Sequence, residues 1–422
     1  MKYVHKQFEN GLTVLLMPSD AAESVFVNIL VKVGSRYERS EVSGVSHFLE
    51  HIFFKGSKKY PQPTDIAQTI DAIGGDFNAA TSKETTEFYI KAEKHHLDLI
   101  FGVLTDMMQN PLFDPAEIEK EKGVVIEEIN QYQDSPSDQV ESNLEQAMWP
   151  GSALGREIIG TKETVTALTR DKIAEYKDIF YQPENIILGI SGNFDTEAVM
   201  KKAEAAWAHL PNTKTPKFEP ISIAQKTPQL NIEYKDTQQA HLSLGFLSYE
   251  HDHKKNPAAL VLACILGGNM SSRLFVKIRE QKGLAYYVSA SNTPYFNTGN
   301  FTIHAGLRIA DTLHALEEIV KELRLIKSEA VSEQELQRAK DFIKGKTAIA
   351  FENIHRQLDW IMNQFAFAEH KKTLREFLDE VEKVTAQDVL DVADEIFAGN
   401  RATLAVIGPF KDTAVFENLL KI

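Results

Sequence analysis

Short apolar runs dominate the first part of the chain and predict β-strands. They cover residues 12–16 and 24–31, and a third strand-like stretch covers residues 77–92. From about residue 96 to residue 180 the pattern changes to that of amphipathic helices. Strands that are grouped in the sequence and then followed by helices favour an α+β fold with a largely antiparallel sheet over a doubly wound parallel sheet.

The end of the chain repeats a pattern that occurs near its middle. An amphipathic helix at residues 169–180 and an apolar strand at 186–194 have a counterpart in residues 386–397 and 402–410. Both pairs have the pattern of a helix followed by an apolar strand that ends in glycine. We predict an internal duplication of the chain, with chance similarity between two amphipathic helices as the alternative.

Chain length and turn-forming residues predict where the two halves divide. A single hydrophobic core stops growing near roughly 250–300 residues, and this chain has 422. Prolines with polar neighbours interrupt every regular pattern between residues 211 and 228. We therefore predict an N-terminal domain at 1–210, a linker at 211–228 and a homologous C-terminal domain at 229–422. Each domain is expected to be an antiparallel β-sheet packed with α-helices.

Composition excludes several classes of protein. With 43% hydrophobic and 25% charged residues, the chain has the make-up of a globular protein and not of a disordered or fibrous one. No apolar stretch reaches the roughly 18–20 residues of a membrane span, and no apolar signal core follows the first charged residues. The single cysteine, Cys264, lies in an apolar run and cannot form an internal disulfide. These features predict a protein of the bacterial cytoplasm.

The charge balance points to the kind of partner. Sixty acidic against 46 basic residues give a formal net charge of −14. This charge repels nucleic acid and acidic lipid, so neither is expected as a main partner. A basic or unfolded peptide is better tolerated.

The strongest chemical signal is the sequence His47-Phe48-Leu49-Glu50-His51. On a helix, His47 and His51 lie one turn apart and Glu50 lies on the same face. Two imidazoles can then bind one metal ion while the carboxylate faces a metal-bound water. This arrangement is suited to metal-assisted hydrolysis. The alternative is a helix that carries two histidines at its border by accident.

A catalytic zinc usually takes three protein ligands, so a third ligand is expected elsewhere in the chain. The acidic helix at 117–129 offers candidates, among them Glu121 and Glu128, which lie two turns apart on one face. One of them can bind the metal while the other supports a ligand from behind. The same residues are also typical of a solvated acidic helix face, in which Lys120 and Lys122 lie between the glutamates in the sequence. Spacing alone leaves this choice open.

Taken together, these motifs resemble the inverted-zincin peptidases of the insulinase, pitrilysin and mitochondrial-processing-peptidase family, peptidase family M16. The resemblance rests on residues 44–56, on residues 74–81, and on Glu121 followed seven positions later by Glu128. It covers nearly the whole chain and points to the small, two-domain bacterial branch. It implies a zinc metalloendopeptidase that binds one Zn²⁺ per chain and hydrolyses peptides or unfolded segments in an enclosed chamber.

The resemblance assigns roles to particular residues of the first half. His47, His51 and Glu128 become the zinc ligands, and the family pattern selects Glu128 over Glu127. Glu50 becomes the general base, and Glu121 becomes the acid that supports a ligand.

The resemblance also implies substrate-binding residues. Asn78 and Ala79 would belong to the sheet edge along which an extended substrate adds as a further strand. Asn78 is equally typical of a turn. In the second half, Arg279 and Tyr286 match an arginine–tyrosine pair that contacts the substrate backbone and stabilises the oxyanion.

The family's larger members close four such domains around a substrate, so this two-domain chain is expected to form a homodimer in which Arg279 and Tyr286 act in trans. Two other interpretations stay open: a non-catalytic subunit, and a catalytic subunit that depends on a different partner, as in processing peptidases. A metal-storage or sensing protein is harder to reconcile with Glu50. The remaining histidines with notable neighbours are expected to be structural or solvated: His95, His96, His241, His251 and His253.

Overall fold

The computed structural model describes residues 2–221, 225–398 and 401–420 and divides the chain into two compact units. The first unit comprises the chain up to Gln131, Arg156–Glu219 and Ala350–Lys371. The second comprises Tyr132–Gly155, Pro220–Ile349 and the chain from Lys372 onward. Among the described residues, every helix is too short or too polar to cross a membrane.

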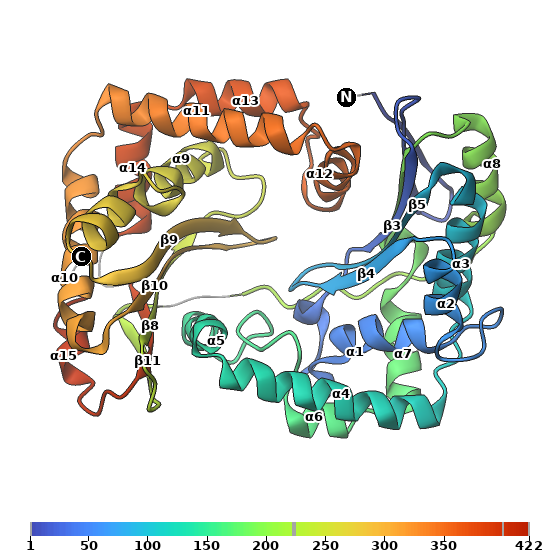
Figure 1. The fold of residues 1–422 in the computed structure, drawn as a ribbon, viewed down its shortest axis with the longest axis horizontal. Coiled ribbons are helices and arrows are strands. Elements are labelled where there is room, and N and C mark those ends of the chain that lie inside the picture. Colours follow the sequence, from blue (N-terminus) through green and yellow to red (C-terminus); the bar gives the residue numbers. More distant parts are fainter. Residues whose placement is uncertain (1, 222–224, 399–400, 421–422) are drawn as a thin grey trace. The chain divides into compact units, whose positions relative to one another are not determined.

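The first unit contains a six-stranded sheet in the order β1-β2-β6-β3-β5-β4. Figure 1 labels β3, β4 and β5 of this sheet. Neighbouring strands are antiparallel except for β2 and β6, which are parallel. The strands are β1 (Val4–Gln7), β2 (Thr13–Pro18), β3 (Ser24–Val31), β4 (Asp76–Thr81), β5 (Thr86–Glu93) and β6 (Ile186–Gly192).

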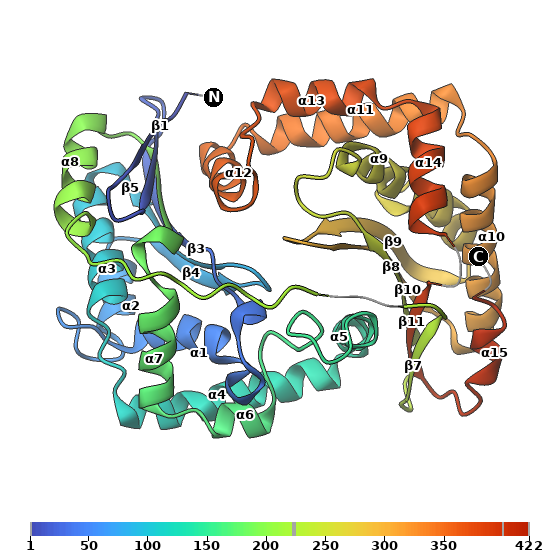
Figure 2. The ribbon, with the colours of Figure 1, turned by 180° about the vertical axis from the view of Figure 1, so that it is seen from behind.

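The second unit contains a five-stranded sheet in the order β7-β11-β8-β10-β9. Figure 2 shows β7 and β11 side by side, and these two strands are the parallel pair of this sheet. The strands are β7 (Gln229–Tyr234), β8 (Ala240–Ser248), β9 (Ala285–Pro294), β10 (Gly299–Leu307) and β11 (Thr403–Gly408).

The two sheets share one topology, which confirms the predicted fold class of two related domains with sheets packed by helices. From β2 onward, each strand of the first sheet has a counterpart in the second at the same place in the order. The prediction of antiparallel sheets needs one correction, because each sheet includes a parallel pair. The last strand of each half, β6 or β11, follows a long helical stretch, and a crossover of that length permits parallel pairing.

Helices cover both faces of each sheet. The first unit holds α1 (Val45–Ile52), α2 (Asp65–Asp71), α3 (Leu97–Gln109), most of α4 (Pro115–Asp134), α6 (Lys162–Thr166), α7 (Arg170–Phe180), α8 (Thr196–Trp207) and α12 (Ile354–Phe367). The second unit holds α5 (Pro136–Met148), α9 (Asn256–Gly267), α10 (Thr312–Ser328), most of α11 (Glu333–Ala350), α13 (Leu374–Lys383), α14 (Ala386–Ile396) and α15 (Ala414–Glu417).

The main core of the first unit lies between one face of its sheet and the helices that include α1 and α3. Val27 and Ile29 of β3 pack there with Phe48 of α1, and all three are fully buried. Phe26 and Leu30 of the same strand point to the other face, because side chains alternate along a strand. The first sheet is therefore buried on both sides.

Each unit takes one helix from the other half of the chain. α12 lies late in the sequence but packs against β6 and β2 of the first sheet. α5 lies in the first half but packs against β11 and β8 of the second sheet. A glycine makes room at both contacts: a Cβ atom at Gly189 would lie 2.2 Å from Met362 Sδ, and one at Gly245 would lie 2.7 Å from Met148 Sδ. The sequence patterns did not indicate this exchange.

The first part of the predicted linker is held on the surface of the first unit. The backbone N–H of Thr215 donates to Glu184 at 2.9 Å, and the Phe218 ring lies 3.9 Å from the guanidinium carbon of Arg36. The rest of the linker, from Pro220, belongs to the second unit, and residues 222–224 lie outside the described residues.

Candidate metal centre

The helix α1 is fixed at its N-terminus by a buried carboxylate. Glu38 accepts hydrogen bonds from the backbone N–H groups of Gly44 at 2.7 Å and of Ser46 at 2.8 Å. These N–H groups have no partner within the helix, so the carboxylate replaces a capping side chain. Gly44 has a φ of 93°, and a Cβ atom there would lie 2.5 Å from the Ile159 carbonyl oxygen. The start of α1 therefore requires glycine.

The structure brings together the three residues that the sequence predicted as ligands. One ligand atom from each of His47, His51 and Glu128 lies within 4.8 Å of the others. Glu128 Oε2 is 3.7 Å from His47 Nε2 and 3.4 Å from His51 Nε2. The histidines come from α1 and the glutamate from α4. Two imidazole nitrogens and one carboxylate oxygen form a donor set that fits zinc.

Glu121 contacts the His51 ring at Nδ1, the nitrogen that does not face Glu128. Its Oε1 lies 2.8 Å from His51 Nδ1, and its Oε2 lies 3.0 Å from Lys55 Nζ. A carboxylate that binds Nδ1 fixes the ring and directs Nε2 to a metal. Glu121 thus contacts a predicted ligand, and its role as the supporting acid stays a prediction.

Neighbouring groups of the site shift the pKa values of the two histidines in opposite directions. Burial and the nearby His51 lower the pKa of His47 to about 4. Burial also acts to lower the pKa of His51, but hydrogen bonds with Glu121 and Glu128 outweigh it and raise that pKa to about 9. Without a metal, the site therefore keeps one proton on His51 at neutral pH, and a metal ion must displace it.

Glu50 lies beside the ligand group but is not part of it. Burial raises the pKa of its carboxyl, and the charge of Glu128 acts in the same direction, while contact with Thr81 and attraction by His51 oppose them. Thr81 is the last residue of β4, so Glu50 faces the end of that strand. A carboxylate with a raised pKa is suited to take up and release a proton.

Asn78 and Ala79 lie inside β4, which is the last strand of the first sheet and pairs with β5 alone among the described strands. The side-chain oxygen of Asn78 accepts a hydrogen bond from the backbone N–H of Ala79 at 2.9 Å. The turn that the sequence allowed for Asn78 is therefore not formed. The outer edge of β4 can accept an additional strand.

Arg279 and Tyr286 lie near each other in the second unit. Arg279 belongs to a π-helix at Phe275–Gln281, and Tyr286 belongs to β9. The guanidinium carbon of Arg279 is 4.8 Å from the centre of the Phe275 ring and 5.7 Å from that of the Tyr286 ring. Tyr286 is 73% exposed, so its hydroxyl is accessible.

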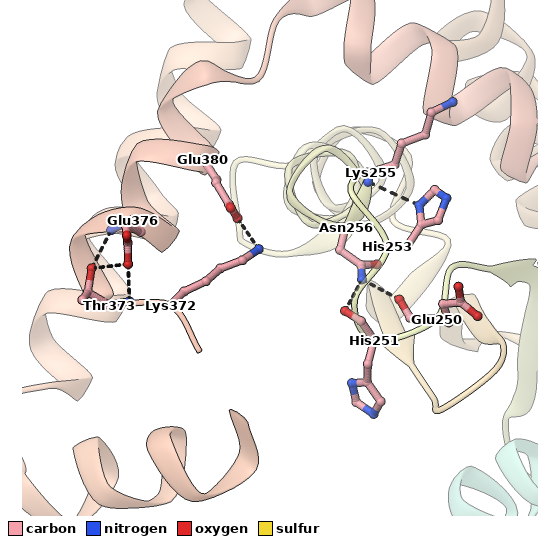
Figure 3. Close-up of polar contacts among 9 residues, drawn as sticks. All are labelled: Glu250, His251, His253, Lys255, Asn256, Lys372, Thr373, Glu376 and Glu380. Carbon is pink, nitrogen blue, oxygen red and sulfur yellow. Dashed lines mark hydrogen bonds and ion pairs between the residues drawn. The ribbon is translucent and has the colours of Figure 1, made fainter. Parts of the chain in front are cut away.

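Three of the remaining predicted histidines, His95, His241 and His253, have local hydrogen-bond partners. Figure 3 shows the loop before α9, where Asn256 donates to the backbone oxygens of Glu250 and His251, and the His253 ring accepts the Lys255 N–H. His95 bonds Glu93 at 2.8 Å, and His241 Nδ1 lies 3.1 Å from the Tyr287 hydroxyl. Within the described part of the chain, none of them joins a metal-binding group.

The fold and the site together define a class: an α+β protein of two related units, one of which has a His–His–Glu group that could hold a metal ion, with a second carboxylate beside it. Residues 13–162 match the family model for insulinase (peptidase family M16), and residues 167–342 match that for the peptidase M16 inactive domain. The chain therefore belongs to peptidase family M16, which confirms the resemblance seen in the sequence.

Relatives and solved structures agree with this assignment. The "Uncharacterized zinc protease YmxG" of Bacillus subtilis is 35% identical over 95% of this chain and 97% of its own length. An "Uncharacterized zinc protease" of Rickettsia bellii is 36% identical over 96% and 97%. The crystal structure of a protease from Helicobacter pylori has the same fold, with a TM-score of 0.90 at 23% identity over 97% of this chain and 99% of that one.

Proposed function

We propose that this protein is a zinc-dependent endopeptidase in which Glu50 is the general base. The observation that supports this proposal best is the His47–His51–Glu128 group, whose His51 is oriented by Glu121. The names of its relatives, which call them zinc proteases, favour zinc as the metal, and the three-residue group fits one ion per chain.

The residues of the chain would divide the reaction between them. Zinc, when bound by His47, His51 and Glu128, supplies a Lewis acid that lowers the pKa of water to roughly 7. Glu50 takes a proton from the water that attacks the scissile carbonyl. It then gives this proton to the leaving nitrogen, so that one C–N bond breaks and one C–O bond forms.

The substrate is proposed to be a peptide or an unfolded segment that adds to β4. The free edge of this strand supports the proposal, because backbone hydrogen bonds bind many sequences. Asn78 and Ala79 would contact that added strand in an enclosed chamber.

Arg279 and Tyr286 are proposed to act on the substrate in a homodimer, each pair serving the metal centre of the second copy. A guanidinium and a phenolic O–H suit a developing oxyanion. The exposure of Tyr286 and its proximity to Arg279 in the second unit support this role. The proposed setting is the bacterial cytoplasm.

The experiment measures metal content and peptide cleavage in wild type, Glu50→Gln and Glu127→Gln. A set of unstructured peptides is the substrate. Glu127 is exposed and adjacent to Glu128, so its substitution controls for charge without removing a ligand. We expect near-stoichiometric zinc in all three proteins and a rate loss of at least about a hundredfold in Glu50→Gln alone.

Two other results would change the proposal. Full activity of Glu50→Gln would contradict the mechanism. Zinc binding without cleavage of any peptide would favour a non-catalytic subunit or a processing-type subunit that needs a different partner, and co-purification of separately tagged copies would then test the homodimer.

A further inference from the structure

The segment that carries Arg279 is a π-helix of seven residues, Phe275–Gln281, in the second unit. A π-helix has i→i+5 hydrogen bonds and is rare, and it is found mostly as a single turn inside an α-helix, frequently at a functional site. This one directly follows two α-helical residues, Arg273 and Leu274. Some feature of its surroundings must therefore favour the π-helical form over a continued α-helix.

Two lysines of this segment form ion pairs with two acids of α10. Lys277 pairs with Glu322. Lys282, the residue after the π-helix, has its Nζ 2.9 Å from Glu318 Oε1. The two acids are four residues apart and so lie on one face of α10.

The spacing of the two lysines distinguishes the two helical forms. Lys277 and Lys282 are five residues apart, and i→i+5 hydrogen bonds place such residues nearly one above the other. In an α-helix, residues five apart point about 140° away from each other, so both lysines could not face α10. The two ion pairs therefore fit the π-helical form and not the α-helical form.

The Lys277–Glu322 pair contains a buried charge. Glu322 is only 1% exposed, and its Oε2 has no hydrogen-bond partner among the described residues. Its neighbours Ile319 and Leu323 belong to the core of the second unit. Such a pair adds little stability, because apolar residues of similar size often serve as well or better. In the best-documented cases, buried ionic groups instead select one conformation over another.

Arg279 is held in a different way from the two lysines. Among the described residues, its ion-pair partner is the adjacent Glu280, at a longer distance of 3.8 Å. Its guanidinium lies over the rings of Phe275 and Tyr286. Because Arg279 lies between the two lysines in the sequence, a change from π-helix to α-helix would alter its direction relative to the Tyr286 ring.

We propose that the ion pair of Lys277 with Glu322 keeps this segment π-helical. The pair thereby positions Arg279 beside Tyr286. This inference rests on the proposed function, in which Arg279 acts on the substrate. It adds two positioning residues, Lys277 and Glu322, which themselves do not touch the substrate.

The test replaces the ion pair as a whole, because removal of the lysine alone leaves a buried carboxylate unpaired and can unfold the protein. Lys277→Met/Glu322→Leu should melt no lower than wild type. With zinc-loaded protein and an unstructured peptide, kcat should fall by at least about tenfold, as for other small misplacements of a group that acts on the substrate. KM should change little, because the proposed binding along β4 does not involve the pair.

The matched control is Lys344→Met/Glu382→Leu. It replaces an ion pair on the surface of the same unit with the same two side chains and should leave kcat unchanged.

Two further measurements show whether the pair acts through Arg279. In the Arg279→Ala background, Lys277→Met/Glu322→Leu should cause no further loss of kcat, because no guanidinium is left to position. A purely structural role would lower kcat in both backgrounds. The crystal structure of Lys277→Met/Glu322→Leu should show i→i+4 hydrogen bonds within residues 275–281 and a guanidinium displaced from the Tyr286 ring.

Three results would overturn the inference: an unchanged kcat in Lys277→Met/Glu322→Leu, an equal loss in the Arg279→Ala background, and a crystal structure in which the π-helix is kept. Failure of the proposed function gives different results. Wild type would then cleave no peptide, or Arg279→Ala would keep full activity. The crystal structure would still decide whether the ion pair maintains the π-helix.

Discussion

The helix after β3 and the helix after β8 hold the same place in the two sheets but differ in what they contribute. α1 has a buried apolar side and a polar side with His47, Glu50 and His51. Its counterpart α9 has no histidine, aspartate or glutamate, and its residues 261–267 are all buried. The same topology thus holds a helix with two members of the His47–His51–Glu128 group in one unit and a core helix in the other, so side chains and not the fold decide which unit carries such a group.

The helices that supply acids differ in the same way. In the first unit, α4 directs Glu121 and Glu128 toward α1. In the second, α11 directs Glu335 to Arg273, and the carboxylate holds the guanidinium with two hydrogen bonds of 2.7 Å. The helix that places two acids beside α1 in the first unit thus corresponds to a helix whose Glu335 forms an ion pair in the second.

The largest expected effect is the loss of the metal when a ligand is removed. His51→Ala or Glu128→Ala should no longer retain zinc after gel filtration, because two protein ligands cannot hold a catalytic zinc firmly. Glu335→Ala removes an acid from the counterpart helix α11 of the second unit and should retain it. Metal analysis by mass spectrometry checks both. Zinc that stays with His51→Ala would place the metal elsewhere.

A smaller loss of zinc binding is expected when Glu121, the acid that contacts His51 Nδ1, is changed. Glu121→Gln keeps the size of the side chain but removes the charge that orients His51. Zinc affinity should fall by about 10–100-fold, as for other acids that support a ligand histidine. Competition with a zinc chelator measures this, with Glu335→Gln as the control. Equal affinities in wild type and Glu121→Gln would show that the contact with His51 is not functional.

The two helix exchanges give a third comparison. Gly189→Ala places a methyl group against Met362 and should lower the free energy of unfolding by about 1–3 kcal/mol. Gly245→Ala should cost less, because its Cβ would be farther from Met148. Urea unfolding of both variants gives the difference, and Met362→Ala should relieve the clash at Gly189. A larger loss at Gly245 would contradict the packing described here.

The sequence predicts those features of the fold and the site that residues close together in the chain determine. The helix expected at residues 169–180 is α7, which spans Arg170–Phe180, and the one expected at 386–397 is α14, which spans Ala386–Ile396. In both, a threonine caps the first turn, so a residue adjacent to the helix in the sequence determines where the helix begins.

The helix exchange has no such local signal. The amphipathic patterns of α5 and α12 show that each buries one face, but not which sheet it covers. The choice of Glu128 over Glu127 also came from the family resemblance, since a helical period places several glutamates near one face. The Asn28–Asp359 contact joins residues 331 positions apart, and no pattern along the chain predicts it.

The last prediction concerns pH. It tests whether the hydrogen bonds with Glu121 and Glu128 raise the pKa of His51. Its pKa of about 9 means that the metal-free site carries a proton on His51 at neutral pH, and only the neutral ring binds zinc. Zinc affinity should therefore rise by about tenfold per pH unit between pH 6 and 8. His47, with a pKa of about 4, is already neutral and adds nothing to this slope. Chelator competition at fixed ionic strength measures the slope.

Glu121→Gln makes this prediction specific. The substitution removes a carboxylate that holds the proton on His51, so the pKa of His51 should fall and the affinity should become less dependent on pH in the upper part of the range. A slope that is unchanged by Glu121→Gln would mean that Glu128, and not Glu121, raises the pKa of His51. A zinc affinity that is constant from pH 6 to 8 in wild type would mean that His51 is neutral before the metal arrives, and the hydrogen bond to Glu121 would then only orient the ring.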